Sequence, residues 1–327
     1  MTVQESVYGV VMKIPMAIVV LLACSACRPK VDDTGTGGCE VVAEHDWNAD
    51  GTVDERTVYD YDVDGNLVEE KRDSDADGRV NQRISYTYDD DGNLLTVAIN
   101  GVVFSRCTYD SEGNKLSAEG IDNEGNVTFR STWTYDMGGK LIIYESDREA
   151  DGVVDLRVNY TYDDEDLLAS KEWDQEVDGT VDEREEYSYD TRGNLVTTER
   201  DQDADGTVDT LRTYAYDADG NLVLEEHDYD ADGTADARWT YAYEGDGNLV
   251  SEEEDSDADG IVDECRSYAY DTDGNLVSEE HDVDADSAVD ERWSYTYNDD
   301  GNLVLEEHDV NADGETDERW TYIYDCP

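Results

Sequence analysis

Residues 228–254 read DYDADGTADARWTYAYEGDGNLVSEEE, and units of this 27-residue length and pattern recur in register along most of the chain. The first nine residues follow the pattern D-x-D-x-D-G-x-x-D. A repeat period of about 20–50 residues is typical of an array of identical supersecondary units. We therefore expect the 327 residues to form one repeat array, and not the one to three ordinary domains that length alone would suggest.

Two short strands are predicted within each unit. Residues 239–243, Trp-Thr-Tyr-Ala-Tyr, alternate aromatic with small or hydroxyl side chains, and this period of two indicates a β-strand. Asp217, Gly220 and Asn221 have the chemistry of a tight turn, and residues 222–227 supply a second strand. The sequence thus predicts an all-β fold, a repetitive antiparallel β-hairpin meander with acidic loops along one edge.

The acidic phrase recurs nine times, which makes it a candidate metal site. A turn needs only one Asp or Asn, whereas acids at positions 1, 3, 5 and 9 repel one another unless a cation lies between them. Ca²⁺ accepts about six to eight oxygen ligands. The predicted ligands are Asp46, Asn48, Asp50 and Asp54; Asp73, Asp75, Asp77 and Asn81; Asp147, Glu149, Asp151 and Asp155; Asp174, Glu176, Asp178 and Asp182; Asp201, Asp203, Asp205 and Asp209; Asp228, Asp230, Asp232 and Asp236; Asp255, Asp257, Asp259 and Asp263; Asp282, Asp284, Asp286 and Asp290; and Asp309, Asn311, Asp313 and Asp317.

The acidic phrase does not predict an EF-hand. That site requires a bidentate Glu at position 12 between two helices, and only Glu185 meets this requirement. The phrase instead resembles the strand-joining loops of integrin-type propellers, which implies a backbone carbonyl ligand at position 7. A β-propeller made from paired units is the alternative fold, and it ranks second because every hairpin here has its own loop. Ser287 replaces the loop glycine in one unit, so a strained or weak site is expected there.

The turn phrase carries a family resemblance. Tyr268-Ala-Tyr270-Asp271-Thr-Asp-Gly274-Asn275-Leu276 resembles the YD repeat of the Rhs and wall-associated protein families, and it recurs along nearly the whole chain after the N-terminal segment. The resemblance implies a spiralling sheet of hairpins, and surface or toxin-delivery roles. The longer acidic loop departs from the family pattern, so the sequence leaves open whether the sheet closes. No toxin domain is expected after the last unit, which ends at Tyr324-Asp325-Cys326-Pro327.

Two shorter units between Val97 and Asp136 lack the acidic phrase. They keep the Tyr-Asp ends, at Tyr109-Asp110 and Tyr135-Asp136. They could form a bend or a distinct ligand surface, but loss of a dispensable metal site is the favoured interpretation.

The N-terminus predicts export. A basic residue and the apolar run 14–23 have the pattern of a secretory signal, assigned to residues 1–23. Leu21-Leu22-Ala23-Cys24 resembles the bacterial lipobox, which implies lipidation of Cys24, secretion across the inner membrane and anchoring at the outer membrane or cell surface. Residues 24–41 are predicted to be the lipidated cysteine and a flexible tether, and residues 42–327 to be the hairpin repeat domain.

Composition limits the partners. With 86 Asp and Glu against 23 Lys and Arg, the net charge is −63, which argues strongly against nucleic acid or an anionic membrane surface as a direct partner. No nucleophile elbow, zinc spacing or phosphate-binding loop is present, so we do not expect an enzyme.

His227, His281 and His308 precede acidic loops, and Arg or Glu at equivalent positions favours a surface location for them. After Cys24 five cysteines remain, and their pairing stays open.

These observations lead to two functional hypotheses. The first is a lipid-anchored cell-envelope protein whose β-repeat domain is stabilised by calcium and acts as a structural, adhesive or ligand-binding module. The second is an Rhs-like surface protein that contacts glycans or a secreted partner, with the metal incidental. The aromatic rows favour cross-strand packing ladders over a sugar platform.

Overall fold

The computed structural model describes residues 38–245 and 247–326, and these form 22 β-strands with no helix among them. The described residues accordingly contain no helix long and apolar enough to span a membrane. The predicted signal and Cys24 lie outside the described residues. The strands are β1 (Cys39–Asp46), β2 (Glu55–Tyr61), β3 (Leu67–Asp73), β4 (Gln82–Tyr88), β5 (Leu94–Ile99), β6 (Val102–Tyr109), β7 (Lys115–Ile121), β8 (Val127–Tyr135), β9 (Leu141–Asp147), β10 (Leu156–Tyr162), β11 (Leu168–Gln175), β12 (Glu183–Tyr189), β13 (Leu195–Asp201), β14 (Thr210–Tyr216), β15 (Leu222–Asp228), β16 (Ala237–Tyr243), β17 (Leu249–Asp255), β18 (Glu264–Tyr270), β19 (Leu276–Asp282), β20 (Glu291–Tyr297), β21 (Leu303–Asp309) and β22 (Glu318–Asp325).

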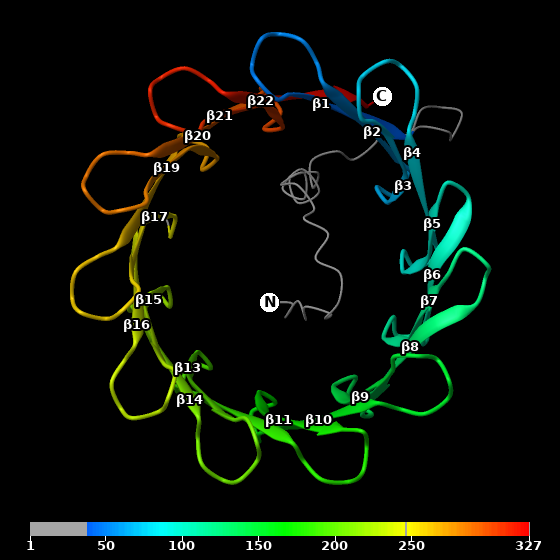
Figure 1. Ribbon diagram of the computed structural model, residues 1–327, viewed down its shortest axis with the longest axis vertical. Helices are drawn as coiled ribbons and strands as arrows, with labels where there is room; N and C mark the ends of the chain where they lie inside the picture. The colour runs from blue at the N-terminus through cyan, green and yellow to red at the C-terminus, as the bar shows by residue number, and fades with distance from the viewer. Residues whose placement is uncertain (1–37, 246, 327) are drawn as a thin grey trace.

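The strands form one closed antiparallel sheet. Each strand pairs with the next along the chain, and β1 also pairs with β22, with Val41 opposite Tyr324 and His45 opposite Trp320. Figure 1 shows the resulting ring, in which chain order is the order around the circle. The predicted all-β hairpin meander is confirmed, and the question of closure is answered. The alternative of a β-propeller was wrong, because the hairpins share one continuous sheet and do not divide into blades.

The two edges of this closed sheet differ in chemistry. Because the meander alternates direction, all connections from an odd to an even strand lie at one edge and all connections from an even to an odd strand lie at the other. The nine acidic loops are odd-to-even connections, so they share one edge, which we call the acidic rim. The Tyr-Asp-x-x-Gly-Asn turns occupy the opposite edge, the turn rim. In Figure 1 the acidic loops are the large loops that project outward.

The YD phrase builds the turn rim by side-chain capping. In the turn after β18, Asp271 Oδ1 accepts the N–H groups of Asp273 and Asn275, both at 2.9 Å, and Oδ2 accepts the Asn275 side-chain amide at 2.9 Å. The Gly274 φ of +85° is a conformation that costs glycine least. Hydrogen bonds from Asn275 lower the pKa of Asp271 because they favour its charged form. The motif is thus a tight turn in which the Asp carboxylate accepts hydrogen bonds from the turn's own N–H groups.

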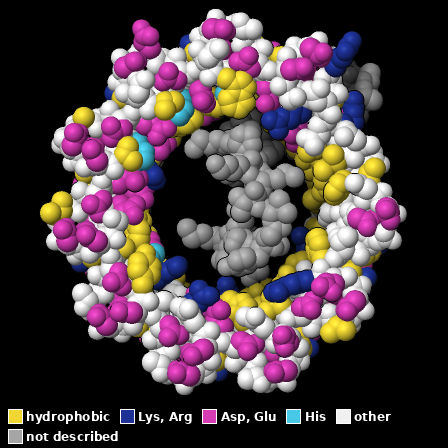
Figure 2. Space-filling model, in the orientation of Figure 1, with side chains coloured by type: hydrophobic (Ala, Val, Ile, Leu, Met, Phe, Trp, Pro, Cys, Tyr) yellow, Lys and Arg dark blue, Asp and Glu magenta, His cyan; other side chains and the backbone are white. Residues whose placement is uncertain are grey.

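The two faces of the sheet carry different side chains. One face has Arg-Glu pairs across neighbouring strands, such as Arg238 with Glu226 at 2.6 Å. The other has Trp, Tyr and His rings, such as Trp293 stacked on His308 with centroids 3.7 Å apart. Figure 2 shows His and hydrophobic side chains bordering the central opening, which identifies the aromatic face as the inner one. This confirms cross-strand aromatic packing.

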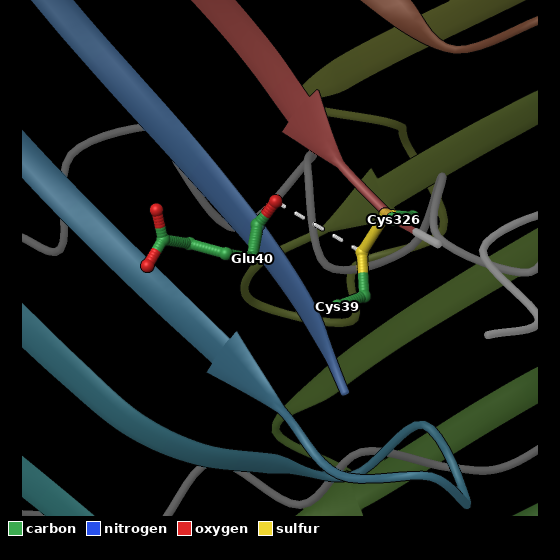
Figure 3. Close-up of a disulfide and its surroundings, with 3 residues drawn as sticks. All are labelled: Cys39, Glu40 and Cys326. Atoms are coloured by element: carbon green, nitrogen blue, oxygen red, sulfur yellow. Dashed lines mark hydrogen bonds between the residues drawn. A yellow bond between two sulfur atoms is a disulfide. The ribbon is translucent and has the colours of Figure 1, made fainter. Parts of the chain in front are cut away.

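A disulfide joins the two ends of the described chain. Cys39 at the start of β1 bonds to Cys326, which follows β22 and lies 287 residues later in the sequence (Figure 3). Both cysteines lie at the turn rim, and Cys39 packs with Val41, Tyr59 and Tyr61 in a small buried cluster. Residues 39–41 therefore belong to the sheet, although the sequence placed them in the tether. Cys107 and Cys265 are free thiols.

Candidate metal-binding loops

Seven of the nine acidic loops begin on a buried carboxylate at the end of a strand, and the first Asp of the other two, Asp201 and Asp282, is half-buried. Asp228 is the last residue of β15, and its side chain and backbone together are 6% exposed. Asp46, Asp73, Asp147, Asp174, Asp255 and Asp309 are buried in the same place in their loops. A buried carboxylate requires hydrogen bonds or a counter-charge. The loop around it supplies the hydrogen bonds.

Backbone N–H groups fold the loop around its acids. In loop 228–236, Asp228 Oδ1 accepts from Asp232 N–H at 3.1 Å and Oδ2 accepts from Gly233 N–H at 2.8 Å. Asp232 Oδ1 accepts from Thr234 N–H at 2.9 Å, and Asp236 Oδ2 accepts from Tyr229 N–H at 2.7 Å. The ninth residue therefore reaches back to the second and closes the loop. The other acidic loops repeat these contacts at equivalent positions, for example in residues 201–209 and 309–317.

Two residues in each loop adopt a left-handed backbone conformation, and loop 174–182 has a third, Glu176. In loop 228–236 the two are Ala231, with φ +51°, and Gly233, with φ +92°. A left-handed conformation costs a residue with a Cβ roughly 1–2 kcal/mol. Ser287 takes the glycine position in its own loop with φ +76°, so it incurs the cost that glycine avoids elsewhere.

In five loops three carboxylates approach one another closely. One oxygen of each lies within 4.8 Å of the other two, although exposed acids can gather this way without an ion. The four loops outside this set have Asn48, Glu149, Glu176 or Asn311 at the third position. The five groups are Asp73, Asp75 and Asp77; Asp201, Asp203 and Asp209; Asp228, Asp230 and Asp236; Asp255, Asp257 and Asp259; and Asp282, Asp284 and Asp290.

The close approach of the loop carboxylates alters their pKa values. Burial works to raise the pKa of Asp73, but hydrogen bonds from Gly78 and other loop groups outweigh it and lower that pKa. The pKa of Asp75 is raised, first by its hydrogen bond with Asp73 and then by partial burial and the charge of Asp77. A raised pKa caused by neighbouring carboxylates is a sign that their negative charges repel one another. A divalent cation between them would relieve this repulsion.

The donor set fits a hard cation. Asp230, Asp232 and Asp236 each use one oxygen to accept a backbone N–H. A carboxylate has about four lone-pair positions, so these groups keep capacity for a metal ion. All ligand atoms would be oxygens, which suits Ca²⁺ and does not suit a thiolate- or imidazole-seeking metal. The carboxylate groups of these five loops, which are among the residues predicted from the sequence, could therefore hold a metal ion.

A belt of ion pairs lies just inside the acidic rim, and sequence reasoning missed it. In four of the nine loops the residue before the loop pairs with a Glu at the start of the preceding even strand: Arg72 with Glu55 at 2.6 Å, Arg200 with Glu183 at 2.7 Å, His281 with Glu264 at 2.8 Å, and His308 with Glu291. The His side chains are 10–16% exposed, so the expected surface location was wrong. The constant spacing of 17 residues between partners was the signal.

One protein-family model matches part of the repeat region. The RHS Repeat family model matches residues 61–101, which run from the end of β2 to the turn after β5. No curated protein matches the chain.

Solved structures with a similar chain path include toxin complexes and a porin-like protein. The crystal structure of TcdB2-TccC3 is 16% identical, with 80% of this chain and 16% of that chain covered and a TM-score of 0.36. The Tc holotoxin pore of Photorhabdus luminescens is 16% identical, with 80% and 19% covered and a TM-score of 0.25. A porin-like protein from Bacteroides uniformis is 11% identical, with 91% and 100% covered and a TM-score of 0.32. This chain thus spans less than a fifth of the two toxin chains.

Proposed function

We propose that this chain, whose repeats are of the RHS type, is a lipid-anchored protein of the cell envelope with a calcium-stabilised ring. The ring acts as a structural, adhesive or ligand-binding module and not as an enzyme. The supporting observation is the repetition of one loop geometry at a single rim, with a buried first Asp in seven loops and three converging carboxylates in five. Each bound Ca²⁺ would remove two units from a net charge of −63, so metal binding and folding are coupled.

The calcium proposal is tested by unfolding the full chain carrying Cys24→Ser, which removes the predicted lipid. Urea unfolding followed by circular dichroism is compared in excess Ca²⁺ and in EGTA. We expect dissociation constants on the order of 10⁻⁴ to 10⁻³ M, as in extracellular calcium modules. A site held at ten times its dissociation constant stabilises the folded state by about 1.4 kcal/mol. Unfolding curves that coincide with and without Ca²⁺ would refute the proposal.

Matched variants separate coordination from loss of charge. Asp230→Asn removes a predicted ligand from the acidic rim. Asp219→Asn makes the same chemical change in a YD turn at the turn rim, where its carboxylate is not a predicted ligand. Only Asp230→Asn should reduce the stabilisation gained from Ca²⁺. Equal losses in both variants would mean that Ca²⁺ only screens the acidic surface.

The anchor is tested by fractionating cells that express the full chain. Cys24→Ser should move the protein from the membrane fraction to the soluble one, because a single residue would carry the lipid. Cys27→Ser is the control, since Cys27 is the weaker lipidation candidate. Membrane association that survives Cys24→Ser contradicts the anchor without affecting the calcium proposal.

A further inference from the structure

The inner face of the ring has two parts of different chemistry. Residues that pair across neighbouring strands lie on the same face of a sheet, so the inner face can be followed from Trp293 around the ring. From β12 through the seam to β3 it carries Glu side chains, such as Glu252, Glu279 and Glu306. The paired inward positions of β5 to β11 hold no Asp or Glu. We call this part of the inner face the apolar wall.

The apolar wall presents large apolar side chains to the central opening. Val102 and Phe129 on this wall are 39% and 41% exposed. A Cβ on Gly120 would lie 2.0 Å from the Phe129 ring, so glycine lets this ring lie against β7. In Figure 2 hydrophobic side chains border the opening at the right and below, where Figure 1 places β5 to β11, and acidic side chains border it on the left. A contiguous apolar surface of this kind marks a binding site. Its inward residues include Val97, Phe129, Trp133, Tyr144, Val158 and Trp173.

Two Lys ammonium groups lie over aromatic rings at this wall. The Lys115 Nζ lies 5.5 Å from the centroid of the Trp133 ring. The Lys171 Nζ lies 6.0 Å from the centroid of the Tyr160 ring and 5.8 Å from that of Tyr187 on β12. An ammonium group over a ring is held electrostatically, and its N–H groups can still donate hydrogen bonds.

Neither of these ammonium groups forms an ion pair in the part of the chain that the structure describes, although the chain has 86 Asp and Glu. The other two described Lys each pair with an Asp. Glu185 is the register partner of Lys171, but its carboxylate accepts a hydrogen bond from the hydroxyl of Tyr187. Two unpaired positive charges therefore stand at an apolar surface.

We propose that the apolar wall binds a fatty acid, with the acyl chain against the apolar side chains and the carboxylate at Lys115 or Lys171. Contact with the wall removes the acyl chain from water, and an ammonium group favours an anionic head group through charge-assisted hydrogen bonds. The Glu side chains on the rest of the inner face repel a carboxylate. The net charge of −63 acts weakly at the wall, because charges more than about 8 Å away are largely screened at physiological ionic strength.

The two free thiols of the described chain provide the test. Cys107 lies on the apolar wall opposite Ala118, and Cys265 lies on the outer face opposite Asp282; both are half-buried. The full chain carrying Cys24→Ser, which removes the predicted lipid, is alkylated with N-ethylmaleimide in dodecanoate below its micelle concentration, and peptide mass spectrometry resolves the thiols. At ten times its dissociation constant, dodecanoate should slow alkylation of Cys107 about tenfold, because only the ligand-free protein reacts. Alkylation of Cys265 should keep its rate.

The same assay tests the head group and the Lys side chains. Dodecyltrimethylammonium has the same chain with a positive head group, and it should bind at least about tenfold more weakly than dodecanoate. Lys115→Met combined with Lys171→Met should weaken dodecanoate by a similar factor, because contacts with the acyl chain remain. Arg106→Met is the matched control, since Arg106 pairs with Glu119 on the outer face.

Phe129→Glu should abolish the protection of Cys107 by placing a negative charge on the wall. Ile261→Glu adds the same charge on an acidic loop and should leave the protection unchanged. Circular dichroism must show that both variants keep the fold; if Phe129→Glu does not, Val102→Glu replaces it.

Three results of the alkylation assay overturn the proposal: no protection of Cys107, equal protection of both thiols, or equal binding of the two head groups. Binding to phosphatidylglycerol vesicles in place of soluble dodecanoate also overturns it, because the ligand would then be a membrane surface.

Discussion

The hydroxyl of Tyr270, at the end of β18, donates a 2.9 Å hydrogen bond to the backbone carbonyl of Leu249, at the start of β17. The backbone pairing of these two strands covers only residues 251–254 and 264–267, so the tyrosine bridges strand ends that the sheet itself does not join. The same bond occurs for Tyr88, Tyr109, Tyr162, Tyr189, Tyr297 and Tyr324. The tyrosine of the YD phrase thus holds successive hairpins together.

Tyr270→Phe should therefore weaken the ring at the turn rim. The substitution keeps the ring packing and removes one hydrogen bond to a backbone carbonyl, so we expect a loss of about 1 kcal/mol in the free energy of unfolding. Urea unfolding in Ca²⁺ measures this loss. Tyr229→Phe is the control, because Tyr229 is 55% exposed on an acidic loop. A Tyr270→Phe variant as stable as the parent would contradict this role.

The disulfide should stabilise the closed sheet at its seam. Cys39 and Cys326 enclose nearly the whole repeat domain, and a bridge across so long a loop removes conformational entropy from the unfolded chain worth about 5 kcal/mol at most. Changing both residues to Ser should lower the free energy of unfolding by several kcal/mol. Changing Cys107 and Cys265 to Ser should leave it nearly unchanged. The disulfide assignment fails if mass spectrometry of the unreduced protein finds both Cys39 and Cys326 free.

Local patterns in the sequence predicted the hairpin well. Alternation in residues 239–243 and the turn chemistry of Asp271 and Gly274 act over a few residues, so they can be recognised in one unit. Closure depends on how twist and curvature accumulate over 22 strands until β22 meets β1. No single unit encodes that sum. The pairing of Cys39 with Cys326 could not be predicted from the sequence, because these residues come together only when the ring closes.

The candidate site was predicted for the same local reason. Positions 1, 3, 5 and 9 of an acidic loop are near in sequence, and Asp228, Asp230 and Asp236 do converge. The ion-pair belt was missed because His281 and Glu264 are 17 residues apart and meet only through strand pairing. Equivalent positions occupied by Arg suggested solvent exposure. The His side chains are instead buried beside a Glu, whereas the Arg side chains at this position are 38–45% exposed.

Ser287→Gly should strengthen the loop that departs from the pattern. Ser287 holds a φ of +76°, while the matching Gly233 and Gly260 hold φ values near +90° with open space where a Cβ would lie. Relief of the backbone strain should raise the free energy of unfolding by about 1 kcal/mol. The reverse change, Gly233→Ser, should lower it by a similar amount in the same urea experiment. Opposite or absent effects would show that Ser287 is not strained.

We expect the free energy of unfolding to depend on pH through buried carboxyl groups of the inner face, such as Glu306. Glu306 is 6% exposed, and burial raises its pKa, although the Tyr322 hydroxyl donates a 3.1 Å hydrogen bond to it. Burial also raises the pKa of Glu279. A carboxyl group whose pKa is raised by folding stabilises the fold below its unfolded pKa of about 4.3, and this contribution is lost as pH rises through the folded value.

In EGTA, the free energy of unfolding should therefore fall as the pH rises from about 5 to 7. Glu306→Gln keeps an acceptor for Tyr322 and cannot ionise, so it should flatten this dependence. The difference should persist at high salt, because salt screens buried charges poorly. At lower pH the trend should reverse. Turn carboxylates such as Asp271 have lowered pKa values, and their protonation weakens the hydrogen bonds that they accept within the turn. A Glu306→Gln variant with the parental pH dependence would show that repulsion between exposed acids, and not the buried inner face, determines the response to pH.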